Sequence, residues 1–160
     1  MVHNHSPLTD WTDPESVDLI GLDPGIADLV KELHTYPGVG TYASCSGLMS
    51  DHNGTKNEYP YIVVIIDDQF PVGVIVKLMQ ESRLRDWELS ARVEDRGVYS
   101  LNFKYRPLHA GSFKLPKELK SQIETCWDID WRIFDHVTDA DVKNSWRKLR
   151  TLLRNTLGDQ

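Results

Sequence analysis

The feature that most constrains the fold is an alternation of apolar and polar residues on both sides of a turn. Residues 87–93 place an apolar side chain at every second position, and residues 99–105 do the same. The segment between them, Asp95-Arg96-Gly97, is a turn sequence. Because side chains along a strand alternate between two faces, this pattern predicts an antiparallel hairpin with one buried face.

Two more strands are predicted before the hairpin. Gly40–Ser44 forms a short strand, and Tyr61–Ile66 is an unbroken apolar run rich in β-branched residues. Such a run is typical of a strand that is covered on both faces.

Helices are predicted between and after these strands. Asp23 as N-cap and Pro24 at the first helical position begin a helix that ends near Tyr36, before Pro37-Gly38. A second helix begins at Pro71, and its predicted buried residues are Val72, Ile75, Val76 and Met79.

A third helix is predicted over residues 116–127, and residues 128–137 are ambiguous. Thr138 or Asp139 caps a last helix, whose predicted buried stripe is Val142, Trp146, Leu149, Leu153 and Leu157. On an adjacent face, this helix carries the basic residues Lys143, Arg147, Arg150 and Arg154. Such a stripe is typical of a solvated helix face, and an anionic ligand or RNA is the alternative.

The order α-β-β-α-β-β-α-α predicts an α+β fold. We expect a single-domain sandwich, with a mixed sheet of about four strands and helices packed over it. Residues 1–22 are acidic and lack periodicity, so they are expected to form a loosely packed arm before the domain of residues 23–160.

Composition excludes several classes of protein. The chain has 160 residues, 40% of them hydrophobic, and a net charge of -6. No apolar run approaches the ~20 residues that span a bilayer, and the first residues do not resemble a secretory signal. Two cysteines do not suggest a disulfide framework. We therefore expect a cytoplasmic protein without membrane contact, and the sequence leaves oligomerisation open.

The charge is unevenly distributed along the chain. Residues 1–60 have a net charge of -7, whereas residues 101–160 have a net charge of +3. Proteins that bind long nucleic acids by neutralising phosphates are usually basic overall. The acidic balance disfavours tRNA as a partner, and any such contact would use the C-terminal third.

Small residues around a cysteine mark the candidate site. Thr41, Ser44, Cys45, Ser46 and Gly47 precede a loop that extends to Pro60 and is long for a compact domain. Small side chains let a ligand approach the backbone, and hydroxyl and amide groups can donate to anions. The alternative is a turn in which the serines satisfy their own backbone.

Other groups complete this predicted site. Asp51 and His52 lie on the loop, and Arg106 and His109, after the hairpin, are expected to face it. Cys45 is a candidate nucleophile if a neighbour lowers its pKa, and otherwise a packing residue. We predict no metal site, because the chain has no closely spaced ligand pair such as H-x-x-x-H or C-x-x-C.

The segment Thr41-x-x-Ser44-Cys45-Ser46-Gly47, after a helix and Pro37-Gly38, resembles the wybutosine-synthesis tRNA methyltransferase family over about residues 25–66. That family has a Ser-Ser-Cys-Ser-Gly-Arg segment and transfers a methyl group from S-adenosylmethionine to a modified guanosine of tRNA. The resemblance implies that Ser44, Cys45, Ser46 and Gly47 line an active cleft. This chain has Ala43 where the family usually has serine, and Leu48 where it has arginine.

Three functions follow as hypotheses. The first is binding, with possible sequestration, of a nucleotide-like or other small anionic ligand over Thr41–Gly47, because the residues show no evident acid–base constellation. The second, implied by the resemblance, is an S-adenosylmethionine-dependent methyltransferase acting on tRNA or a nucleoside. The third is a protein-interaction module that uses the acidic arm and the basic last helix. The residues alone imply no cofactor.

Overall fold

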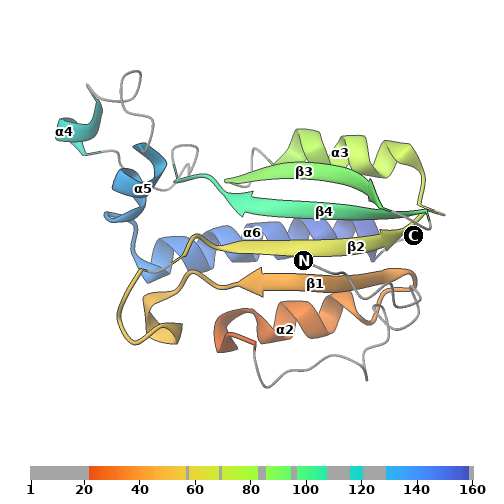
Figure 1. The fold of residues 1–160 in the computed structure, drawn as a ribbon, viewed down its shortest axis with the longest axis horizontal. Coiled ribbons are helices and arrows are strands. Elements are labelled where there is room, and N and C mark those ends of the chain that lie inside the picture. Colours follow the sequence, from red (N-terminus) through yellow and green to blue (C-terminus); the bar gives the residue numbers. More distant parts are fainter. Residues whose placement is uncertain are drawn as a thin grey trace.

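A four-stranded sheet forms the centre of the molecule, with the strand order β1-β2-β4-β3 (Figure 1). The computed structural model describes residues 22–56, 58–68, 70–82, 86–94, 97–107, 116–120 and 129–158. Almost all of the predicted acidic arm, and the second half of the predicted helix 116–127, lie outside these residues. The strands are β1 (Val39–Cys45), β2 (Tyr61–Asp67), β3 (Trp87–Glu94) and β4 (Val98–Tyr105).

The α+β class is confirmed, but every pair of neighbouring strands is antiparallel, so the sheet is not mixed. The predicted hairpin explains this difference. β3 and β4 pair directly, with Trp87 opposite Tyr105, and β4 then pairs with β2. β2 and β3 therefore point the same way, as a helix-linked pair usually does, but β4 lies between them and they never form a parallel ladder.

Three helices cover one face of the sheet. They are α2 (Pro24–Leu33), α3 (Val72–Ser82) and α6 (Asp139–Leu157). In Figure 1, α6 runs behind the central strands, with α2 beside β1 and α3 beside β3. Shorter helices are η2 (Met49–Asp51), α4 (Lys117–Lys120) and α5 (Ile129–Phe134). Within the described residues, no helix is long and apolar enough to span a lipid bilayer.

The hydrophobic core lies between this face of the sheet and the helices. Alternate residues of β2 point into it, with Ile62, Val64 and Ile66 fully buried. On the other face, Tyr61 and Val63 are only partly buried, whereas Ile65 is buried. The unbroken apolar run therefore predicted the strand correctly, but its expected coverage on both faces is wrong at Tyr61 and Val63.

The last helix confirms its sequence pattern. Thr138 and Asp141 form a capping box at its start, each side chain bonding to the other's backbone amide. This satisfies two amides that the first turn of a helix leaves without a partner. The five predicted stripe residues are all buried: Val142, Trp146, Leu149, Leu153 and Leu157.

The predicted buried face of α3 is correct at Ile75 and wrong at the other three predicted residues. Ile75, Leu78 and Ser82 face the core. Val72, Val76 and Met79 are instead 63%, 46% and 46% exposed. Apolar residues cover most of the circumference at the start of this helix, so periodicity alone did not determine which side packs. The contacts of α3 with β3 and α6 determine its orientation.

We expect Leu149→Ala to lower the free energy of unfolding by about 2–5 kcal/mol, because it leaves a cavity in the centre of the core. Leu149 is fully buried. Val93→Ala is the control, since Val93 is 72% exposed, and it should change stability by less than about 1 kcal/mol. Urea unfolding followed by circular dichroism measures both; similar losses for the two variants would contradict this placement of the core.

Candidate functional site

The loop after β1 turns back sharply at Gly47. Its φ is +67°, and a Cβ atom at this position would lie 2.4 Å from the Pro60 ring. A side chain is excluded by both the backbone conformation and the lack of space. The small residue at this position therefore serves the packing of the loop's two ends against each other.

Ser46 joins this loop to two helices through its buried polar atoms. Its amide donates to Asp23 Oδ2 over 2.8 Å, and its hydroxyl donates to Asp51 Oδ2 over 2.8 Å. The hydroxyl also accepts from the amide of Leu48, and the carbonyl accepts from the indole N–H of Trp146 over 2.8 Å. Ser46 is fully buried, so its donors are committed within the protein.

Aspartate side chains also accept hydrogen bonds from other backbone amides around the loop. Asp51 Oδ2 accepts from the amide of Gly25 over 3.0 Å. Asp139, the first residue of α6, accepts from the amides of Met49 and Ser50 over 2.8 and 3.1 Å. Burial raises the pKa of the Asp139 carboxyl, but these two hydrogen bonds, together with the Ser50 side chain and the charge of Lys143, outweigh burial and hold the pKa below the ordinary value. The loop donors expected to bind a ligand anion thus bind carboxylates of the chain itself.

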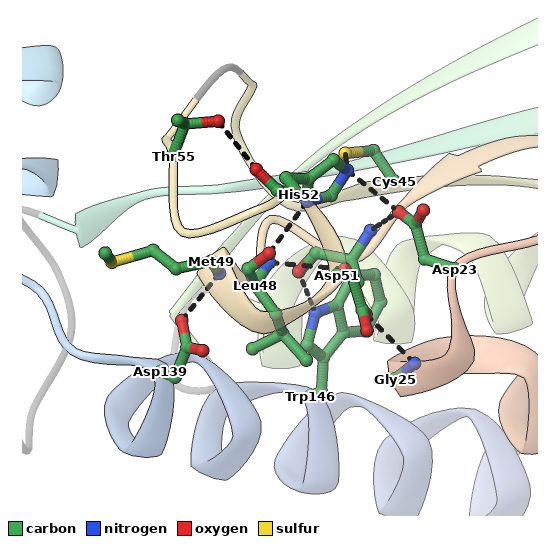
Figure 2. Close-up of polar contacts among 11 residues, drawn as sticks. Asp23, Gly25, Cys45, Leu48, Met49, Asp51, His52, Thr55, Asp139 and Trp146 are labelled. Carbon is green, nitrogen blue, oxygen red and sulfur yellow. Dashed lines mark hydrogen bonds and ion pairs between the residues drawn. The ribbon is translucent and has the colours of Figure 1, made fainter.

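Three side chains that can ligate metals meet above this loop. Cys45 Sγ lies 3.7 Å from His52 Nε2, and Asp23 Oδ2 lies 3.4 Å from the same nitrogen (Figure 2). All three atoms lie within 4.8 Å of one another. His52 Nδ1 is 2.7 Å from the carbonyl of Leu48. Only a protonated Nδ1 can bond to a carbonyl, so in the neutral ring Nε2 carries the lone pair that faces Cys45 and Asp23.

This geometry does not activate Cys45 as a nucleophile. Burial raises the pKa of its thiol to about 11; a hydrogen bond from the Gly47 backbone opposes the rise, while the carboxylates of Asp23 and Glu58 add to it. A reactive thiol needs a lowered pKa. Asp23 also contacts the nitrogen that faces the thiol, whereas the carboxylate of a catalytic triad holds the other one. The thiol is therefore protonated at neutral pH.

A cavity of about 200 Å³ lies on another side of the loop, between α2 and α6. Trp146 lines it, and the same indole donates to Ser46. Its lining includes three basic residues and one carboxylate: Lys143, Arg147, Arg150 and Asp28.

Arg150 also pairs with Glu32 over 2.9 Å. Hydrogen bonds from Arg154, Tyr36 and Arg150 outweigh the effect of burial and lower the pKa of Glu32 to about 2.

A second cavity, of about 290 Å³, lies on the sheet face opposite the core. Its lining residues are Glu58, Tyr59, Tyr61, Asn102, Lys104 and Trp131. The rings of Tyr59 and Trp131 contact each other at 4.3 Å between centroids with their planes tilted by 36°, and the ammonium group of Lys104 lies over the ring of Tyr59. Its charges are balanced, with one lysine and one glutamate, so it favours an anion less than the cavity between α2 and α6 does.

The structure gathers only part of the predicted site. Cys45, Ser46, Gly47, Asp51 and His52 lie together. Thr41 lies in the first half of β1, roughly 13 Å from Cys45 at about 3.3 Å per residue, and its hydroxyl contacts His34 there.

The remaining predicted site residues do not join this group. Ser44 is next to Cys45 in β1, opposite Ile62, but adjacent side chains of a strand point to opposite faces of the sheet. Arg106 pairs with Glu88 of β3 over 2.9 Å, and so lies on the side of β4 away from β1. His109 lies outside the described residues.

Sequence reasoning missed three residues of the site. Asp23 was interpreted only as a helix cap, yet its side chain makes no capping hydrogen bond and instead reaches Ser46 and His52. Asp139 and Trp146 were interpreted as a cap and a core residue. No local pattern indicates these roles, because each depends on a partner at least 23 positions away in the sequence.

Comparison with known proteins gives no relative: no family model, curated protein or solved structure matches the chain.

We expect Asp139→Ala to release the loop from α6 at a cost of about 1–2 kcal/mol at neutral pH. It removes two charge-assisted hydrogen bonds, whose usual contribution of about 1.5–3 kcal/mol each is reduced because Asp139 is partly exposed and water can replace it. The amides of Met49 and Ser50 should then exchange hydrogen faster, as measured by NMR or mass spectrometry. Asp135→Ala, which removes an exposed carboxylate, is the control.

The same variant has a defined pH dependence. Since the folded pKa of Asp139 is lowered, its contribution is complete above the unfolded pKa of about 3.9 and is lost as the pH falls through the folded value. The stability difference between wild type and Asp139→Ala should therefore shrink below about pH 4. A difference that stays constant between pH 7 and pH 3 would argue against this assignment.

Proposed function

We propose that the protein binds a small anionic, nucleotide-like ligand in the cavity between α2 and α6. The observation that carries this proposal is the cavity beside the loop that follows β1. It is lined by Lys143, Arg147 and Arg150. Ammonium and guanidinium groups are the usual partners of phosphate and carboxylate. The cations are presented on successive turns of α6 and therefore on one side of the helix.

The size and mixed chemistry of the cavity narrow the class of ligand. A volume of about 200 Å³ is below the ~300–1,000 Å³ of sites that enclose a drug-sized molecule. It suits an anionic group and an attached sugar, with the remainder of the ligand outside. Asp28 would repel a bare anion but can accept a hydrogen bond from a hydroxyl, as acidic residues do from ribose. A sugar phosphate or nucleotide satisfies both requirements.

This proposal moves the ligand away from the surface of Thr41–Gly47. Asp23, Asp51 and Asp139 already take the amides and hydroxyl around the loop, and their charge disfavours an additional anion there. The segment Ser44–Gly47 still affects the cavity, because the carbonyl of Ser46 accepts a hydrogen bond from the indole of Trp146, which lines the cavity. A binding role without catalysis, such as sequestration, is consistent with the protonated thiol of Cys45.

The test is isothermal titration calorimetry with inorganic phosphate, ribose 5-phosphate and nucleoside monophosphates. We expect the phosphosugars to bind more tightly than phosphate. Lys143→Ala and Arg147→Ala should each weaken binding by about 10-fold or more, the equivalent of one charge-assisted hydrogen bond. The matched control is Arg92→Ala on β3, which removes an exposed arginine away from the cavity. Absence of binding, or equal losses in all three variants, would refute the proposal.

The methyltransferase alternative rests on the resemblance of Ser44–Gly47 and is tested in the same experiment by adding S-adenosylmethionine. Binding of that compound, weakened by Cys45→Ala, would favour the methyltransferase over the nucleotide-binding proposal.

A further inference from the structure

We infer that Asp23, Cys45 and His52 form a binding site for a single divalent transition metal ion of the zinc class. The three residues supply one carboxylate, one thiol sulfur and one imidazole nitrogen from separate parts of the chain: the residue before α2, the end of β1 and the loop after it. Sulfur, nitrogen and oxygen ligands in this combination suit zinc, cobalt and related ions better than magnesium or calcium.

Two of the three separations between the ligand atoms fit a tetrahedral ion, and the third, between Cys45 Sγ and the Asp23 carboxylate, is no more than 4.8 Å. Zinc bonds of about 2.3 Å to sulfur and about 2.0–2.1 Å to nitrogen place these two atoms about 3.5–3.6 Å apart at tetrahedral angles. Cys45 Sγ and His52 Nε2 are 3.7 Å apart. The corresponding separation of nitrogen and oxygen is about 3.3–3.4 Å, and His52 Nε2 lies 3.4 Å from Asp23 Oδ2.

The histidine is oriented as metal-binding histidines are. Its Nδ1–H donates to the backbone carbonyl of Leu48, which directs the Nε2 lone pair at the other two ligands. A partner on the second nitrogen is nearly universal among metal-bound histidines. Asp23 is similarly held by the amide of Ser46. Both ligands are therefore fixed before an ion arrives.

Access and charge also suit a cation. The side chains of His52 and Asp23 are 22% and 21% exposed, so an ion can reach them from solvent. Three protein ligands leave a fourth position for water or a substrate, as in catalytic zinc sites, whereas structural sites use four. Binding replaces the thiol proton with a metal–sulfur bond and releases that proton to solvent. The site is separate from the cavity between α2 and α6 and does not depend on the proposed function.

The test is titration of the untagged, chelator-treated full chain with Co²⁺. We expect one equivalent to produce a thiolate-to-cobalt charge-transfer band and the intense visible absorption of a four-coordinate ion, both abolished by Zn²⁺. Cys126→Ser should leave the band unchanged. Because the chain has two cysteines, a band in that variant assigns the sulfur to Cys45 without altering the site.

Cys45→Ser should abolish the band. His52→Ala and Asp23→Asn should each weaken zinc binding by about 100-fold or more, beyond the 10–100-fold that loss of an outer partner costs, as measured by competition with a chromophoric chelator. Circular dichroism of each metal-free variant checks its fold. His136→Ala, at an exposed histidine, and the double variant His3→Ala/His5→Ala are the matched controls and should bind as wild type. A wild-type protein without the band, a band lost in Cys126→Ser, or zinc binding lost only in the histidine controls would overturn the inference.

Discussion

The buried serine at position 46 holds the candidate site together. Its backbone and hydroxyl make hydrogen bonds to Asp23 before α2, Asp51 in the loop and Trp146 in α6. Hydrogen bonds to a charged partner contribute about 1.5–3 kcal/mol each, and more is lost when a buried group is left without one. Ser46 therefore helps to position α2 relative to α6 at the cavity between them, together with the ion pairs of Arg150 and Arg154 with Glu32.

A loop rich in small residues with free amides is well suited to receive an anion, and in this protein the chain supplies that anion itself. Asp51 and Asp139 hold amides of Gly25, Met49 and Ser50, much as a bound phosphate would. The sequence pattern is thus compatible with two structures, one open to a ligand and one closed by aspartates. Only long-range contacts distinguish them, since Asp139 lies 90 positions from Met49.

The elements of the fold were predictable where the signal is local. The hairpin of β3 and β4, the boundaries of α6 and its buried stripe follow from alternation, capping and helical spacing. The orientation of α3 was not predictable, because it depends on how this helix packs against β3 and α6. The absence of parallel pairing was not predictable either, because it depends on which strands lie beside β4. The sequence indicated the segment that contains Cys45, Ser46 and His52, but it did not indicate how these side chains are arranged in space. Asp23 joins these side chains only because α2 packs against β1.

The uneven charge of the sequence has a structural counterpart in the two proposed sites. The acidic N-terminal third supplies Asp23, whose carboxylate meets Cys45 and His52 and attracts a cation. The more basic C-terminal third supplies Lys143 and Arg147, which line the cavity against α2 and attract an anion. Ser46 contacts both sides, since its amide bonds to Asp23 and its carbonyl to Trp146. A change that displaces Ser46 should therefore affect both sites, whereas a change to one set of charges should affect only its own ligand.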